Sequence, residues 1–155
     1  QAANLARQIA AAELSPAFMC GDGCRERDQL IGGGGSAVEG MYVTTIGRDV
    51  TDVPEAEAFV KKFEAKHGSL SIFSGQSYEA TKVVLSALER ASKSGQLDRK
   101  SVLSALHDTE DYLGILGFPI GFDEKGDVKG GEIFVLTVRG DDFSAVKQYR
   151  TEDVK

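Results

Sequence analysis

The feature that most constrains the fold is an alternation of short apolar runs with longer helical patterns, which stops near residue 112. Runs of four or five β-branched, aromatic or other apolar residues indicate buried strands, and apolar residues three and four apart indicate amphipathic helices. Beyond Gly114, extended segments are separated only by turns such as residues 123–126. We expect strands at residues 17–20, 41–45, 70–73, 115–122, 133–138 and 143–149, and helices at residues 4–13, 25–31, 54–68, 76–93 and 98–107.

This order of elements predicts an α/β fold, a Rossmann-like lobe in three layers with a parallel sheet covered by helices. We assign residues 1–112 to this lobe and residues 113–155 to a β meander of the same domain that crosses out of the sheet. The 155 residues are enough for one domain with a sizeable core. The inward-facing residues expected on the two later helices are Ala80, Val84, Leu88, Ala91, Val102, Leu103 and Leu106.

The charge of the chain disfavours nucleic acid as a partner. The formal net charge is −6 and the sequence pI is about 5.0, whereas a polyanion prefers a basic surface. No apolar run approaches the roughly 20 residues of a membrane span. Residues 1–12 are helical and rich in small residues, so they do not resemble a signal peptide.

Few residues suit catalysis or metal binding. Two cysteines with three residues between them do not supply the roughly four ligands of a zinc site. His67 and His107 both lie near predicted helix C-termini, where a histidine complements the helix dipole. We therefore expect no enzyme activity, no cofactor and no metal.

Two glycine-containing segments resemble ligand loops only superficially. No Gly-Lys-Ser/Thr follows residues 32–36, so this run is not a phosphate loop, and we interpret it as a surface loop. Position twelve counted from Asp123 is Phe134 rather than the glutamate of a calcium loop. We expect a hairpin turn there, with Gly126 at positive φ.

Asp22 is the best candidate for a functional residue. It lies between a predicted strand and a predicted helix, the usual ligand position in open α/β sheets, and Gly21 and Gly23 allow close approach of a ligand or an unusual backbone conformation. The alternative is that Asp22 caps the helix that begins near Cys24. Cys20 and Cys24 either form a disulfide across the loop or remain free thiols, and the sequence leaves both open.

Phe73 and Gln76 are the second pair of candidates. Phe73 ends the third predicted strand, where an aromatic ring either buries a ligand's apolar side chain or packs in the core. Gln76, at the start of the next helix, is a weaker polar candidate. Tyr78 fits packing better than ligand contact.

Four segments in order carry a resemblance to a known family: residues 18–23 (FMCGDG), 37–44 (AVEGMYVT), 73–80 (FSGQSYEA) and 122–130 (FDEKGDVKG). They resemble the C-terminal lobe of the branched-chain amino-acid (Leu/Ile/Val) binding proteins, which are type I periplasmic solute-binding proteins of ABC importers. The resemblance implies two Rossmann-like lobes joined by three hinge strands, which close over a ligand.

The resemblance also implies roles for residues. Asp22 would hold the α-ammonium group of an amino acid and Phe73 would pack on the ligand, whose carboxylate would be bound by the other lobe. Aspartate in place of the longer glutamate of some amino-acid binders, and the two flanking cysteines, keep aromatic acids and amides among the candidate ligands. Two further hypotheses are a sensor or regulatory domain of the same fold, which would signal to a partner chain, and an enzyme that uses Cys20 or Cys24.

The resemblance further implies a periplasmic or other extracytoplasmic location, a signal peptide upstream of Gln1, and the membrane subunits of an ABC importer as partners. A lone lobe that lacks its first strand has an unpaired sheet edge, which invites pairing with another chain. We therefore expect self-association of the isolated chain.

Overall fold

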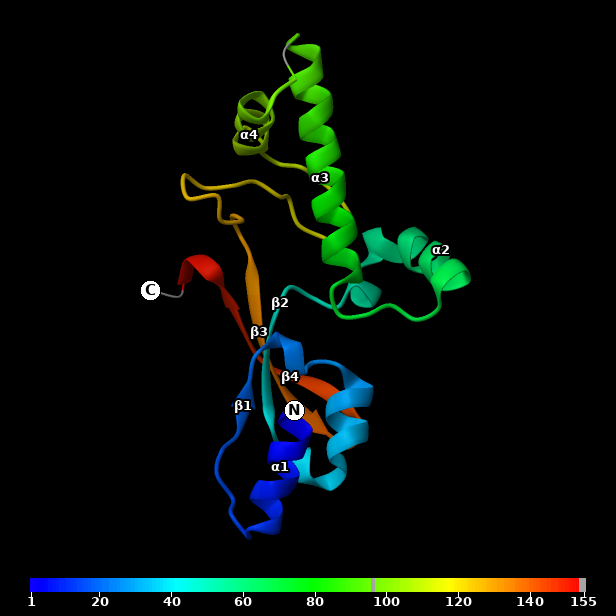
Figure 1. Ribbon diagram of the computed structural model, residues 1–155, viewed down its shortest axis with the longest axis vertical. Coiled ribbons are helices and arrows are strands. Elements are labelled where there is room, and N and C mark those ends of the chain that lie inside the picture. The colour runs from blue at the N-terminus through cyan, green and yellow to red at the C-terminus, as the bar shows by residue number, and fades with distance from the viewer. Residues whose placement is uncertain (96, 154–155) are drawn as a thin grey trace. The chain divides into compact units, whose positions relative to one another are not determined.

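The structure, a computed structural model, describes residues 1–95 and 97–153, and the chain forms two compact units. The first unit comprises Gln1–Gly47 and the described chain from Glu132 onward, and the second comprises Arg48–Gly131. The chain therefore enters the second unit after Gly47 and returns to the first after Gly131 (Figure 1). The division expected at residue 112 falls inside the second unit and stays a prediction.

The first unit is built on a four-stranded mixed sheet in the order β1-β2-β3-β4. The β1–β2 pair is parallel and the two other pairs are antiparallel, so the predicted α/β class is confirmed with a mixed rather than a parallel sheet. The expectation that the C-terminal strands leave this sheet is wrong, because β3 pairs with all five residues of β2. The strands are β1 (Met19–Cys20), β2 (Tyr42–Ile46), β3 (Glu132–Arg139) and β4 (Asp142–Arg150).

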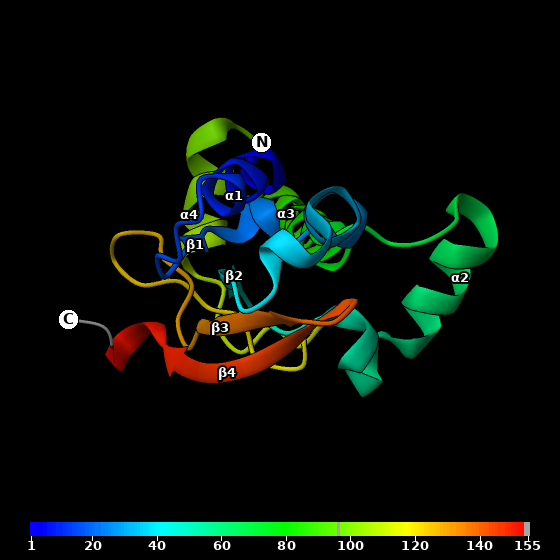
Figure 2. The ribbon, with the colours of Figure 1, turned by 90° about the horizontal axis from the view of Figure 1, so that it is seen from below.

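Helix α1 (Ala2–Ala11) lies on one face of this sheet (Figure 2). Its small residues Ala3 and Ala6 are buried, and the helix packs against the short turns formed by residues 28–38. The expected burial of residues 17–20 is wrong, since only two residues pair and Met19 is 54% exposed at the edge of the sheet. The core of the unit contains Ala3, Ala6, Leu30, Ile31, Val38, Met41, Val43 and Val138.

The glycine run at residues 32–35 is helical rather than a surface loop, which corrects the sequence interpretation. It joins a π-helical turn, η2 (Asp28–Gly32), to a 3-10 turn, η3 (Gly35–Val38). Gly34 is buried, and a Cβ atom there would overlap the side chain of Val38. A Cβ on exposed Gly33 would make only an ordinary contact, 3.5 Å from that of Ala3. Close packing therefore accounts for Gly34 but not for Gly33.

The second unit contains the three helices predicted from periodicity: α2 (Glu57–His67), α3 (Ser74–Lys93) and α4 (Arg99–His107). Pro54 opens a 3-10 turn, η5 (Pro54–Ala56), before α2, and Gly68 ends α2 with φ +82°. Asp98 caps α4 as predicted, through reciprocal bonds with Ser101. Both histidines lie in the last turn of their helices, as expected.

The inward face of α3 differs from the prediction. Val84 is exposed, whereas Glu79 and Val83 are buried, because small residues and one carboxylate line the packed face. Leu103 of α4, expected inward, is also exposed. Arg90 fastens α4 to α3 by donating to the Ala105 carbonyl at 2.6 Å and to the Thr109 hydroxyl at 2.7 Å. The buried residues of α3 are Gly75, Glu79, Val83, Ala87 and Ala91.

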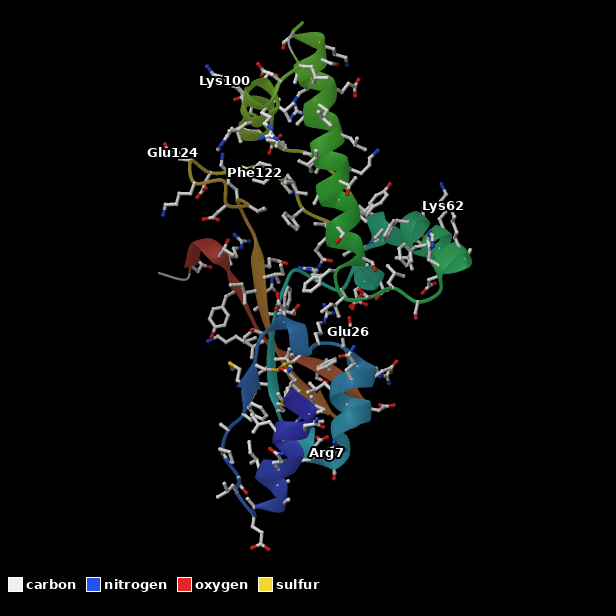
Figure 3. All side chains as sticks on the ribbon, viewed as in Figure 1. Arg7, Glu26, Lys62, Lys100, Phe122 and Glu124 are labelled. Carbon is white, nitrogen blue, oxygen red and sulfur yellow. A yellow bond between two sulfur atoms is a disulfide. The ribbon has the colours of Figure 1, made fainter. Side chains whose placement is uncertain are left out.

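Two segments of the second unit that were expected to be extended adopt turns instead. Residues 70–73 form a turn rather than a strand, and residues 115–118 turn instead of extending to Phe122. Isolated bridges pair Tyr112 with Ile120 and Phe122 with Val128. The turn at residues 123–126 is confirmed, with Gly126 at φ +87°, and Figure 3 shows Glu124 extending outward there. None of the helices described is both long and apolar enough to cross a membrane.

Candidate functional site

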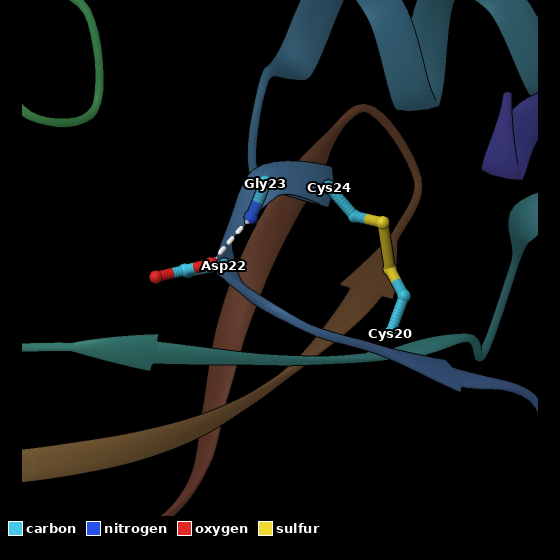
Figure 4. Close-up of a disulfide and its surroundings, with 4 residues drawn as sticks. All are labelled: Cys20, Asp22, Gly23 and Cys24. Atoms are coloured by element: carbon cyan, nitrogen blue, oxygen red, sulfur yellow. Dashed lines mark hydrogen bonds between the residues drawn. A yellow bond between two sulfur atoms is a disulfide. The ribbon is translucent and has the colours of Figure 1, made fainter.

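The loop after β1 forms a short 3-10 turn, η1 (Asp22–Cys24). Two backbone bonds close it, from the Cys24 N–H to the Gly21 carbonyl at 3.0 Å and from the Arg25 N–H to the Asp22 carbonyl at 2.9 Å. The Asp22 carboxylate accepts a third bond from the Gly23 N–H at 2.8 Å (Figure 4). All three bonds are local, so the loop depends on its two ends for its position.

A disulfide between Cys20 and Cys24 joins those ends. The two Cα atoms are 6.3 Å apart, and the ring encloses Gly21, Asp22 and Gly23 (Figure 4). Cys20 lies in β1, and both cysteines pack partly buried against the core of the first unit. Of the two states that the sequence leaves open, the structure contains the bonded one.

Asp22 is the first residue of η1 rather than its cap. Gly21 occupies the N-cap position without a side-chain bond, and the Asp22 carboxylate binds the very next N–H. The interpretation of Asp22 as a cap for a helix near Cys24 is therefore wrong. The carboxylate is partly exposed, forms no ion pair within the described residues, and points away from the disulfide in Figure 4. It is available to a cationic or hydrogen-bond-donating group.

The glycines beside Asp22 leave space rather than supply an unusual backbone. Gly21 has φ −76°, and Gly23 is not among the glycines with positive φ. A Cβ atom on either glycine would meet nothing within 4 Å. Neither glycine is therefore required by local packing, and the surface on both sides of the Asp22 carboxylate is open to a close approach.

Phe73 and Gln76 belong to the second unit, at the start of α3. Phe73 does not end a strand as predicted, because residues 70–73 form a turn. The residue is 36% exposed, and its carbonyl accepts from the Ser77 N–H at 2.9 Å. The Gln76 side-chain oxygen Oε1 is buried without a hydrogen-bond partner among the described residues. A buried acceptor without a partner is costly and calls for an explanation.

Sequence reasoning missed Glu79, which is 1% exposed. Its carboxylate accepts from the Ile115 N–H, and the Gly114 backbone lies against it so closely that a Cβ there would overlap the carboxyl group. Burial, the Glu79 charge and a hydrogen bond to Glu79 raise the pKa of Tyr112. The four-residue spacing of Gly75, Glu79 and Val83 was the available signal. Glu79 holds residues 112–115 against α3.

The candidate residues thus fall into two groups. Gly21, Asp22 and the two cysteines share one loop of the first unit, and Phe73 and Gln76 share the start of one helix in the second.

A family model described as "Periplasmic binding protein" matches residues 1–143 of the chain. A curated relative, the "Leucine-, isoleucine-, valine-, threonine-, and alanine-binding protein" of Pseudomonas aeruginosa, is 34% identical over 134 residues. That match covers 84% of this chain but 34% of the relative, so the chain spans about a third of the relative's length.

Solved structures match over almost the whole chain. A leucine binding protein from Thermotoga maritima superposes with a TM-score of 0.79 at 28% identity, covering 98% of this chain and 42% of that one. A branched-chain amino-acid ABC transporter protein from Thermus thermophilus with bound valine gives a TM-score of 0.69 at 18% identity, covering 94% and 42%. The second likeness concerns the fold alone.

Proposed function

This chain belongs to the periplasmic binding protein family, and from that premise we propose that it is part of an extracytoplasmic receptor that captures an amino acid for an ABC importer. The family consists of solute-binding proteins that are not enzymes. A branched-chain amino acid is the proposed ligand, since the Thermotoga relative is named for leucine and the Pseudomonas relative for leucine, isoleucine and valine, together with threonine and alanine. The remainder of the receptor lies outside these residues, given the third of the relative that they span.

The observation that carries the proposal is the Asp22 carboxylate. It is partly exposed, has no ion pair among the described residues and is flanked by two glycines that the local fold does not require. An amino acid carries an ammonium group at neutral pH, and a charge-assisted bond between such a group and a carboxylate is about twice as strong as a neutral one. We assign the ammonium group of the ligand to Asp22, with Gly21 providing room for its approach.

The start of α3 supports a separate contribution from the second unit. Phe73 is 36% exposed, and its apolar ring would offer packing surface to an aliphatic group. The Gln76 Oε1 atom lacks a donor, and an N–H group of the ligand would supply one. These two assignments rest on observations independent of Asp22.

The proposed location is the periplasm, and the proposed partners are the membrane subunits of an importer. Both follow from the family and from the relatives' names rather than from a surface of this chain.

Isothermal titration of the full-length protein with leucine, isoleucine, valine and phenylalanine tests the proposal. We expect the aliphatic amino acids to bind best, and 4-methylpentanoate, which is leucine without its ammonium group, not to bind measurably. Asp22→Asn should weaken leucine binding about 10- to 150-fold, the loss of a charged hydrogen bond of about 1.5–3 kcal/mol. Asp28→Asn, an exposed acidic residue of the same unit, is the matched control.

A wild-type protein that binds none of these amino acids would refute the proposal. So would an Asp22→Asn variant that binds leucine as tightly as the Asp28→Asn control. Gly21→Ala adds a steric test: it should weaken binding without lowering the melting temperature, because the added methyl group meets no protein atom within 4 Å.

A further inference from the structure

The loop that carries Asp22 has little that holds it in one conformation. Its backbone bonds span only three residues each, and no side chain caps η1. Glycine on both sides of Asp22 makes the unfolded loop unusually variable, since glycine loses more conformational freedom on ordering than any other residue. Ordering each residue of such a loop costs conformational entropy. If binding had to order such a loop, the affinity of the protein for its ligand would be lower.

The two ends of the loop, by contrast, are firmly placed. Cys20 lies opposite Val43 in the β1–β2 pair, and Val43 is fully buried in the core. Cys24 packs against the same core from the other end of the loop. The disulfide therefore fixes the ends of a three-residue segment to the sheet.

We propose that the Cys20–Cys24 disulfide positions Asp22 for ligand binding, so that affinity depends on the oxidation state of this cysteine pair. The ligand part rests on the proposed function; the ordering of the loop does not. Neither cysteine needs to touch the ligand. The disulfide acts by removing loop conformations in which the carboxylate points elsewhere, so that binding no longer has to exclude them.

The size of the effect follows from the ring size. In the chain-entropy model, closing a ring of five residues restricts it by an amount equivalent to about a 30-fold change in an equilibrium constant. This is an upper limit, because the three local hydrogen bonds already order part of the loop. We expect reduction to weaken leucine binding about 3- to 30-fold.

Backbone ¹⁵N relaxation of the full-length protein tests the loop without any ligand. Dithiothreitol supplies the two electrons, becoming its cyclic disulfide while Cys20 and Cys24 become thiols. On reduction, the order parameters of Gly21, Asp22 and Gly23 should fall from about 0.85 to below about 0.6, and that of Val43 should not change. The Cys20→Ser/Cys24→Ser variant should match the reduced protein. An equally ordered loop in reduced protein would overturn the inference.

Leucine titration then tests whether the effect acts through Asp22. The 3- to 30-fold loss on reduction should shrink to less than about 2-fold in Asp22→Asn. An equal loss in both proteins would mean that the disulfide supports the fold generally, and it would overturn the positioning role. If oxidised protein binds no amino acid while the loop loosens on reduction, the proposed function fails and the ordering of the Asp22 loop is supported.

Discussion

Alanine in place of Gly114 is expected to destabilise the second unit through one buried carboxylate. The added Cβ would overlap the carboxyl group of Glu79, which is 1% exposed and accepts from the Ile115 N–H. Overpacking of this kind costs about 1–3 kcal/mol. If the carboxylate shifts, it also loses its bond from the Ile115 N–H, worth about 1.5–3 kcal/mol for a charged acceptor. We expect a total loss of about 2.5–6 kcal/mol in the free energy of unfolding.

Urea unfolding of the full-length protein, followed by circular dichroism, measures this loss. Glu79→Ala alone should also destabilise, because the Ile115 N–H loses its acceptor. In the Glu79→Ala background, however, the carboxyl group that the added Cβ would overlap is absent. Gly114→Ala should then lower the free energy of unfolding by less than about 1 kcal/mol. Gly32→Ala is the matched control: nothing lies within 4 Å of its Cβ position and its φ is not positive, so the change should stabilise by about 0.4–1 kcal/mol.

The prediction fails if the losses of unfolding free energy caused by Gly114→Ala and Glu79→Ala are additive. If Gly114→Ala costs the same with and without the Glu79 carboxylate, the overlap does not exist in the protein.

Three further predictions concern other parts of the chain. Burial and the Glu79 charge raise the pKa of Tyr112 above its usual value of about 10, so protonated Tyr112 favours folding below that pH, and this stabilisation is lost as pH rises through the folded pKa. The ultraviolet titration difference between wild type and Tyr112→Phe should therefore show a raised pKa, which Glu79→Gln lowers. Asp98→Ala should cost about 1 kcal/mol in urea unfolding because α4 loses its capping box, and Asp98→Ser should recover most of it. Light scattering of the isolated 155-residue chain should show concentration-dependent association through the open edges of the sheet, and a monomer at all concentrations would contradict this.

Local signals in the sequence were enough for most of the helices and for the C-terminal hairpin. Periodicity identified α3, Pro54 and Gly68 delimited the segment of α2, and Asp98 identified the start of α4. These signals depend on neighbouring residues only, so they predict helices without knowledge of the tertiary structure. The β1 segment was located but wrongly expected to be buried, because burial depends on where a strand lies in the sheet.

The errors arose where distant residues decide the outcome. Gly34 looked like a loop residue, yet it is glycine because Val38 and the packed turn leave no space for a side chain. The face of α3 was misjudged because Glu79 looks like a solvent-facing residue until Gly114 and Ile115, far along the chain, are seen to enclose it.

The position of the candidate loop was predictable from the sequence, but the oxidation state of its two cysteines was not. The spacing of glycines and aspartate after an apolar run indicated where a ligand would approach. Whether Cys20 and Cys24 bond depends on how β1 and η1 direct them, and sequence spacing carries no such information.

The assembly of the first unit's sheet from both ends of the chain sets an order of events during synthesis. The second unit is continuous and complete once Gly131 has emerged from the ribosome, whereas β2 has no antiparallel neighbour until β3 emerges, and β3 lacks its second neighbour until β4 emerges. A nascent chain that has emerged as far as Gly131 therefore exposes a strand without its antiparallel neighbour. Such unpaired edges are aggregation-prone, so chaperone binding should be strongest in this interval and should end when the last hairpin is released.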